Sequence, residues 1–314
     1  IGLPPVVAGA SPELKARILP SVLAGEKISA LAVTEPGAGS DVAQLATTAK
    51  RDGDHYVVNG SKMFITSGMR ADWTTVAVRT GGPGASGVSL LAIERDTAGF
   101  SRTELKKMGW WASDTAELHF DDCRVPASNL IGAEGQAFPL IMRNFNGERL
   151  TLAASACGAA QACLEDAVAW ARERKTFGQP LIAHQVIRHK LVDMAERIEA
   201  TRALIDDLAS RLDAEAPSPQ PSPRRGEGAE LPSPARGRGA GGEGSSLIAQ
   251  TAMAKNTAAR TMQFCADAAV QILGGSGYMR GVRVERIYRE VKVMMIGGGA
   301  EEILKDLAAR QLGF

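Results

Sequence analysis

The sequence carries no excess charge of either sign and no long apolar run, and each absence excludes a class of protein. Lysine and arginine number 36 against 35 aspartates and glutamates, so no global attraction to nucleic acid or to an anionic membrane is expected. No apolar run approaches the roughly 20 residues needed to span a bilayer. Residues 1–10 also lack the charged start of a signal peptide.

Cysteines are few, and they form no Cys-x-x-Cys pair. Their neighbours are apolar or strand-like, which is typical of small core residues in a protein of a reducing compartment. The sequence therefore predicts buried thiols and no metal site at Cys123, Cys157, Cys163 and Cys265.

What the chain does have is length and a balanced composition. Its 314 residues, 45% hydrophobic and 23% charged, are enough for two domains with ample core. The first residues predict one helix over 12–24, with Ser11 as its N-cap and Gly25 after its end. Because the chain begins with Ile1 rather than methionine, we expect a fragment or a processed product.

From Ile28 the pattern changes to short runs separated by tight turns, which is typical of antiparallel strands. Asp52-Gly53 and Asn59-Gly60 are predicted to be two of these turns. The spacing predicts a β-barrel or sandwich at about 28–131. The predicted strands are 47–50, 55–59, 62–66, 73–79, 88–94, 100–107, 115–120 and 123–125.

After Gly135 apolar residues recur at helical spacing, with a break at 176–180. Long helices with short connections and one apolar face each predict an antiparallel bundle. The predicted helices are 150–171, 187–212, 247–273 and a short one at 301–312.

Residues 216–246 differ from the rest of the chain. They are built on Pro-Ser-Pro and Arg-Gly units and hold almost no apolar side chain, so they cannot bury enough surface to offset the entropy of ordering. We predict a disordered insertion. Glutamates alternate with its arginines, which argues against a nucleic-acid site.

The run Leu31–Asp41, LAVTEPGAGSD, places hydroxyls, carboxylates and flexible backbone in one short loop and predicts a ligand-binding turn. A dinucleotide-binding fingerprint would need a third glycine where Val42 stands and a helix after it, so we reject that alternative. Without further support, a plain glycine-rich turn remains the other interpretation.

This loop resembles the signature of the acyl-CoA dehydrogenase family, and four further segments resemble that family in the expected order. The resemblance covers nearly all of 28–314 apart from the insertion. It implies an α+β fold with a middle β-barrel domain at 28–135 and a C-terminal antiparallel four-helix bundle at 136–314, after a remnant of an N-terminal helical domain at 1–27. The four segments are Met63-Phe64-Ile65-Thr66, Glu148-Arg149-Leu150, Arg174-Lys175-Thr176-Phe177-Gly178 and Gln271 to Tyr278.

The resemblance implies FAD as the cofactor. An aromatic face with an adjacent hydroxyl, Phe64 and Thr66, suits a flat ring with polar edges, and Phe64 replaces the tryptophan of several relatives. The fork of Arg174 suits a diphosphate, which in the family belongs to the FAD of the neighbouring subunit. The implied cofactor-binding residues are Thr34, Ser40, Phe64, Thr66, Arg174, Thr176, Phe177, Gln271, Gly274 and Gly275.

The catalytic base is the most informative position. Many relatives carry a glutamate in the loop before the last helix, but this chain has Gly297-Gly298-Gly299 there. Relatives of the isovaleryl and long-chain type place the glutamate in a Glu-Arg-Leu sequence on the first long bundle helix, which implies Glu148 as the base. Glu301 and Glu302 are rival candidates, and an ordinary solvated helix residue is the alternative for Glu148.

By the same resemblance, the reaction is α,β-dehydrogenation of an acyl-CoA thioester to the trans-2-enoyl-CoA, as in fatty acid β-oxidation. The Gly298 N–H would donate to the thioester carbonyl. The implied substrate-binding residues are Ser40, Asn146 and Arg149. The electron acceptor would be an electron-transfer flavoprotein, and the assembly a homo-oligomer, either a dimer or a homotetramer.

Two alternatives stay open at this point. The first is an acyl-CoA oxidase-like or flavin monooxygenase-like enzyme, and the second is a non-catalytic fragment of the family. The expected compartment is the cytoplasm, or the mitochondrial matrix if the chain is eukaryotic.

Overall fold

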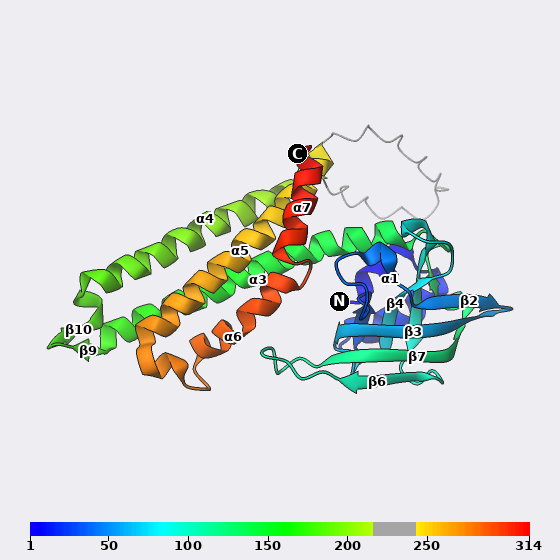
Figure 1. The fold of residues 1–314 in the computed structure, drawn as a ribbon, viewed down its shortest axis with the longest axis horizontal. Coiled ribbons are helices and arrows are strands. Elements are labelled where there is room, and N and C mark those ends of the chain that lie inside the picture. Colours follow the sequence, from blue (N-terminus) through cyan, green and yellow to red (C-terminus); the bar gives the residue numbers. More distant parts are fainter. Residues whose placement is uncertain (216–242) are drawn as a thin grey trace, which may run out of the picture. The chain divides into compact units, whose positions relative to one another are not determined.

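The computed structural model describes residues 1–215 and 243–314, which form two compact units, 1–145 and 146–314. Both units are drawn in Figure 1. The predicted insertion at 216–246 lies outside the described residues, except that 243–246 begin a helix.

Two helices open the first unit, α1 (Leu3–Gly9) and α2 (Pro12–Leu23). The N-cap predicted for α2 is confirmed, because the Ser11 hydroxyl accepts a hydrogen bond from the Leu14 N–H at 3.2 Å. Helix α1 was not predicted. Its signal in the sequence is Pro4, since proline is favoured in the first turn of a helix.

The first unit is built on one mixed, mainly antiparallel sheet of eight strands. Its order is β6-β7-β3-β2-β4-β5-β8, with β1 pairing in parallel with β4. The expected strand-rich middle domain is therefore confirmed. The strands are β1 (Ser29–Ala32), β2 (Thr48–Asp52), β3 (His55–Thr66), β4 (Trp73–Arg79), β5 (Val88–Glu94), β6 (Phe100–Glu104), β7 (Thr115–Pro126) and β8 (Leu130–Ile131).

The predicted turn at Asn59-Gly60 is wrong, because both residues lie inside the long strand β3. The pairing of β3 with β7 shifts register between Val58 and Gly60, which marks a bulge. Gly60 has φ 141°, and a Cβ there would lie 2.7 Å from the Thr47 Cα. The dipeptide therefore provides close backbone approach rather than a reversal of the chain.

Side chains on the two faces of the sheet enter two separate hydrophobic clusters. On β4, Val76 and Val78 enter one cluster, which gathers residues from β1 to β7, while Trp73 and Ala77 enter the other. The second cluster also holds Leu14 of α2 and the start of α3. The alternation follows from the period of two in a strand, and it packs the first unit on both faces of its sheet.

The described part of the second unit is helical, as predicted, with long helices and shorter ones (Figure 1). Helix α5 packs against α4, α6 and α7. Helix α3 joins them through contacts such as that of the Cys157 Sγ with the Ile198 carbonyl of α4, 3.9 Å apart. The helices are α3 (Ala137–Glu173), whose first turns belong to the first unit, α4 (Gln185–Glu215), α5 (Glu243–Leu273), α6 (Arg283–Ile296) and α7 (Glu301–Leu312).

Helix α6 was missed by the sequence prediction. Its buried apolar residues are Val284, Ile287, Val291 and Met294, at the expected spacing, but charged residues occupy most of the positions between them. The four cysteines are buried and free, as predicted. Within 1–215 and 243–314, no helix combines the length and apolar character needed to cross a membrane.

Candidate active site

The loop after β1 is closed by its own backbone. The Glu35 N–H donates to the Ala38 carbonyl at 2.9 Å, and the Ala38 N–H returns the bond at 3.1 Å. The Met63 N–H on β3 donates to the Thr34 carbonyl at 2.8 Å. The predicted turn is therefore a fixed structure attached to the strand that carries Phe64.

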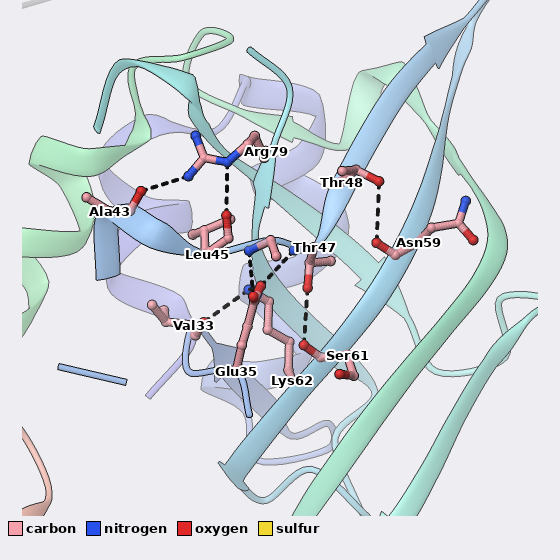
Figure 2. Close-up of polar contacts among 11 residues, drawn as sticks. Val33, Glu35, Ala43, Leu45, Thr47, Thr48, Asn59, Ser61, Lys62 and Arg79 are labelled. Carbon is pink, nitrogen blue, oxygen red and sulfur yellow. Dashed lines mark hydrogen bonds and ion pairs between the residues drawn. The ribbon is translucent and has the colours of Figure 1, made fainter. Parts of the chain in front are cut away.

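A buried ion pair holds the base of this loop. The Lys62 ammonium lies 2.7 Å from a Glu35 carboxylate oxygen and donates to the Val33 carbonyl at 3.0 Å (Figure 2). The other bonds of the carboxylate come from the Ala46 and Thr47 N–H groups. The side chain of Lys62 is fully buried and that of Glu35 is 6% exposed.

Burial and pairing act in opposite directions on these two groups. Burial lowers the pKa of Lys62 to about 8, although the Glu35 charge raises it. Burial opposes ionisation of Glu35, but Lys62 and the donors from Ala46 and Thr47 together lower its pKa. Both groups are therefore ionised at neutral pH, and the pair fastens both ends of the loop.

Arg79 on β4 holds the far side of the same segment. Its Nε donates to the Leu45 carbonyl at 2.9 Å and its Nη2 to the Ala43 carbonyl at 2.7 Å (Figure 2). The Thr47 hydroxyl donates to the Ser61 carbonyl at 3.1 Å. No role for Glu35, Lys62 or Arg79 was expected from the sequence, although Glu35 lies inside the motif.

Contacts and backbone conformation within the chain do not explain why glycine stands at two positions of the loop. A Cβ built at Gly37 meets nothing within 4 Å, and one at Gly39 meets only the Thr34 Cγ2 at an ordinary 3.7 Å. Neither residue has a positive φ. Since neither crowding nor conformation requires glycine, the residues fit a ligand that approaches the backbone closely. Ser40, beside them, is exposed.

Phe64 presents its ring to the surface from an unusual backbone conformation. Its side chain is 65% exposed and its φ is 61°, at a register shift of β3 between Lys62 and Ile65. Such a conformation costs a bulky residue about 1–3 kcal/mol, and it is found mainly at functional sites. Thr66, partly buried, ends the strand two residues later. The arrangement suits an aromatic platform with a hydroxyl beside it.

In the second unit, α3 carries Asn146, Glu148 and Arg149 within one turn. The Arg149 Nη1 donates to the Asn146 Oδ1 at 2.8 Å, and its Nε donates to the Gly298 carbonyl at 2.9 Å. Burial lowers the pKa of Arg149, although the Glu148 charge raises it. The structure thus joins Asn146 and Arg149, which the sequence suggested as substrate contacts, to Gly298, which it suggested as a donor to the thioester carbonyl. Glu148 lies partly buried next to them.

In the glycine loop at 297–299, Gly298 and Gly299 have backbone conformations that only glycine adopts easily. Gly298 has φ 70° and Gly299 has φ 110°. A Cβ at Gly298 would lie 2.7 Å from the Leu152 Cδ1, and one at Gly299 would lie 2.9 Å from a methyl of Leu304. The side chains of Leu152 on α3 and Leu304 on α7 therefore occupy the volume that a side chain at Gly298 or Gly299 would need.

The rival carboxylates after this loop are engaged elsewhere or exposed. Glu301 forms ion pairs with Arg260 and with Lys305, the latter at 2.7 Å. These two partners lower the pKa of Glu301 to about 2. Glu302 is exposed at the first turn of α7. A carboxylate held ionised by two cations is a poor base, so Glu148 remains the better candidate.

The loop after α3 is a short hairpin of β9 (Lys175–Thr176) and β10 (Gln179–Pro180). Phe177 at its tip is 97% exposed with φ 51°. The Thr176 hydroxyl lies 3.1 Å from the His184 Nε2, and Arg174 is exposed. The hairpin therefore holds an aromatic ring and a guanidinium at the surface of the unit.

The other predicted cofactor segment follows α5. Gln271 is exposed in the last turn of the helix, and Gly274 and Gly275 open a short 3₁₀ helix that ends at Tyr278. A Cβ at Gly274 or Gly275 would meet nothing within 4 Å. Gly274 has φ 60°, but Gly275 has no positive φ, so its backbone is open to a ligand in the same way as that of Gly37.

Comparison with known proteins agrees with this architecture. The chain matches the family models of the acyl-CoA dehydrogenase middle domain, over residues 30–123, and the acyl-CoA dehydrogenase C-terminal domain, over 135–229 and 235–313. A mitochondrial isobutyryl-CoA dehydrogenase of Dictyostelium discoideum is 38% identical over 96% of this chain, which spans 66% of that relative.

Solved structures show the same likeness. A probable acyl CoA dehydrogenase from Mycobacterium abscessus has a TM-score of 0.89 and 46% identity, covering 100% of this chain and 76% of its own. A glutaryl-CoA dehydrogenase from Mycobacterium smegmatis, solved in complex with FADH2, has a TM-score of 0.83 and 28% identity, covering 98% and 71%. Together with the sheet and the helices described above, these matches show that the chain belongs to the acyl-CoA dehydrogenase family.

Proposed function

We propose that this chain catalyses the α,β-dehydrogenation of an acyl-CoA thioester to the trans-2-enoyl-CoA, with FAD as cofactor and Glu148 as the base. One observation carries the proposal beyond family membership. The turn of α3 that bears Glu148 is joined to the glycine loop by the bond from the Arg149 Nε to the Gly298 carbonyl, at 2.9 Å. The proposed base and the proposed oxyanion donor therefore belong to one hydrogen-bonded assembly.

Several residues would hold FAD. The exposed ring of Phe64 suits the flavin ring system, together with Thr66 on the same strand and with Thr34 and Ser40 of the loop. The Met63 N–H, next to Phe64, is bonded to the Thr34 carbonyl of that loop. Bound FAD would supply the acceptor for the hydride that leaves the substrate Cβ. The residues that we propose for the diphosphate and adenine parts are Arg174, Thr176, Phe177, Gln271, Gly274 and Gly275. The open glycine backbones at Gly37, Gly39 and Gly275 support this assignment.

The residues of the chain would handle the proton and the developing charge. Glu148 takes the proton from the substrate Cα, and its partly buried position protects the carboxylate from bulk water. The Gly298 N–H donates to the thioester oxygen, where negative charge grows as the proton leaves. Arg149 and Asn146, proposed from the sequence as substrate contacts, also support the loop through their mutual hydrogen bond.

The environment of the enzyme follows from the same assignment. We infer a homo-oligomer, a dimer or a homotetramer, because Phe177 and Tyr278 expose 97% and 78% of their surface. Large exposed aromatic residues are typical of surfaces that a partner covers. We infer an electron-transfer flavoprotein as acceptor and a role in fatty acid β-oxidation. The cytoplasm or the mitochondrial matrix is the proposed compartment, and the relative named as mitochondrial supports the latter.

The test is the visible spectrum of the purified protein, before and after anaerobic addition of straight and branched acyl-CoAs. We expect flavin absorption that bleaches with one class of substrate. Rapid reaction of the reduced protein with oxygen would instead indicate an acyl-CoA oxidase-like or monooxygenase-like enzyme. A protein that stays colourless after FAD is supplied would contradict the proposal and indicate a non-catalytic member of the family.

A further inference from the structure

Helix α5 buries a lysine that the proposed chemistry does not use. Lys255 is 1% exposed, and its ammonium donates to the Met295 carbonyl at 3.0 Å and to the Gly299 carbonyl at 2.9 Å. A buried lysine needs such partners, because an unpaired charge inside a protein is strongly unfavourable. Both partners belong to the end of α6 and the glycine loop that follows it.

The two carbonyls belong to different elements but bind the same Lys255 ammonium group. Met295 lies in the last turn of α6, where carbonyl groups have no partner within the helix. A cation there also interacts favourably with the negative end of the helix dipole. Gly299 lies beyond the helix, so Lys255 ties the helix end to the loop across four residues.

Arg149 holds the carbonyl between them. Its Nε donates to Gly298, so the carbonyls of residues 295, 298 and 299 are all bound by buried cations from two helices. The Gly297 N–H donates to the Val293 carbonyl at 2.7 Å. The Gly298 N–H belongs to the peptide group between Gly297 and Gly298. The peptide groups on both sides of it are held by hydrogen bonds, one through the Gly297 N–H and the other through the Gly298 carbonyl.

These hydrogen bonds are important because the loop consists of three consecutive glycines. Glycine populates positive and negative φ about equally, so an unanchored run of three could turn its peptide groups at little cost. The observed φ values of 70° and 110° for Gly298 and Gly299 are one state among many. A fixed hydrogen-bond donor stabilises a developing oxyanion only if its direction is set before the reaction.

We propose that Lys255 is a positioning residue for the reaction, which orients the Gly298 N–H toward the thioester oxygen by anchoring the Met295 and Gly299 carbonyls, one on each side of that N–H along the chain. The inference rests on the proposed function, because it assumes the acyl-CoA reaction. Burial and the nearby Arg149 charge lower the pKa of Lys255 to about 8. The two cations also add positive potential where the substrate oxygen becomes negative.

The test compares Lys255→Met with the control Thr251→Val in the FAD-loaded protein. Thr251 is equally buried one turn earlier on α5, and its hydroxyl donates only within the helix, to the Leu247 carbonyl at 2.8 Å. The measurement is the rate constant for flavin bleaching by a substrate in rapid mixing, expressed per bound flavin. A loss of folded protein changes the amplitude of this signal, whereas a misdirected donor changes the rate constant.

We expect Lys255→Met to lower the rate constant about 10- to 100-fold, since losing an oxyanion donor outright costs about 100- to 1,000-fold. The substrate concentration for half-maximal rate should change less than about threefold, because positioning affects the transition state more than binding. The isotope effect of substrate deuterated at Cα should rise. Thr251→Val should keep the wild-type rate constant.

A rate constant for Lys255→Met within twofold of wild type would overturn the inference. If that variant does not fold, Lys255→Gln decides, because its shorter, uncharged side chain removes the cation that binds the Met295 and Gly299 carbonyls. A wild-type rate constant for Lys255→Gln would overturn the inference, and a reduced one with normal flavin content would support it. Failure of the wild-type protein to bleach with any acyl-CoA would instead refute the proposed function.

Discussion

The Glu35–Lys62 pair gives the sharpest test of how the cofactor loop is held. Lys62→Met keeps most of the side-chain volume but removes the charge, and it leaves the Glu35 carboxylate buried with only its backbone donors. Glu35→Gln removes the other charge and leaves Lys62 with the Val33 carbonyl. The double variant Glu35→Gln/Lys62→Met leaves neither charge.

The magnitude follows from the contacts. Lys62 makes two hydrogen bonds that involve its charge, one at 2.7 Å and one at 3.0 Å, and each such bond contributes about 1.5–3 kcal/mol. Removing one partner of a buried ion pair costs about 3–5 kcal/mol, which agrees with their sum. We therefore expect Lys62→Met to lower the free energy of unfolding by about 3–5 kcal/mol at pH 7. In the double variant the loss should fall short of the sum of the single losses by about 1–3 kcal/mol.

The assay is urea unfolding of the four proteins at pH 7 and at pH 5. In Lys62→Met the unpaired Glu35 carboxylate is buried, so its folded-state pKa rises above the unfolded value. Its protonation then favours the folded state as the pH falls, and the cost of Lys62→Met should be smaller at pH 5. A cost below about 1 kcal/mol at pH 7, or one independent of pH, would show that Lys62 does not neutralise a buried Glu35 charge.

The remaining predictions concern glycines and one surface ion pair. Gly37→Ala should change stability by less than about 0.5 kcal/mol yet weaken FAD binding, measured by flavin titration, whereas Gly60→Ala should cost about 1–3 kcal/mol in urea unfolding. Gly298→Ala should lower the bleaching rate and the melting temperature together, since its Cβ would meet Leu152. Because Arg260 and Lys305 depress the pKa of Glu301, their stabilisation is complete above about pH 4.5 and lost as the pH falls through about 2. The difference in unfolding free energy between wild type and Arg260→Met should therefore shrink over that range. A difference that does not change with pH would contradict this prediction. Normal FAD affinity in Gly37→Ala would contradict the proposed approach of FAD to that glycine.

Local signals in the sequence were sufficient for much of the fold. Ser11 marked the start of α2, and the strands β4 and β5 were predicted at their observed bounds because each is a continuous β-rich run. The dipeptide Asn59-Gly60 gave a wrong prediction, because Asn-Gly occurs both in tight turns and in bulges. Only the pairing with the partner strand distinguishes a turn from a bulge. In α6, charged residues between the apolar positions concealed the helical stripe.

The site was predictable only where a motif carried it. The motifs gave Glu148, Arg149 and the glycine loop, but not the bond that joins Arg149 to Gly298, because its partners are 149 residues apart. Lys255 was missed for the same reason. From the sequence, a lysine among alanines on α5 is expected to be solvent-exposed. The carbonyls that bind it lie 40 and 44 residues away, so the sequence does not reveal them.

The most direct measurement is the rate of flavin bleaching by acyl-CoA in Glu148→Gln, with Glu302→Gln as the matched control. Glutamine has the shape of glutamate but cannot accept the substrate proton, and Glu302 is an exposed carboxylate next to the same loop. We expect both variants to bind FAD. The flavin should fail to bleach with acyl-CoA only in Glu148→Gln. Bleaching at the wild-type rate in Glu148→Gln would contradict the assignment of the base.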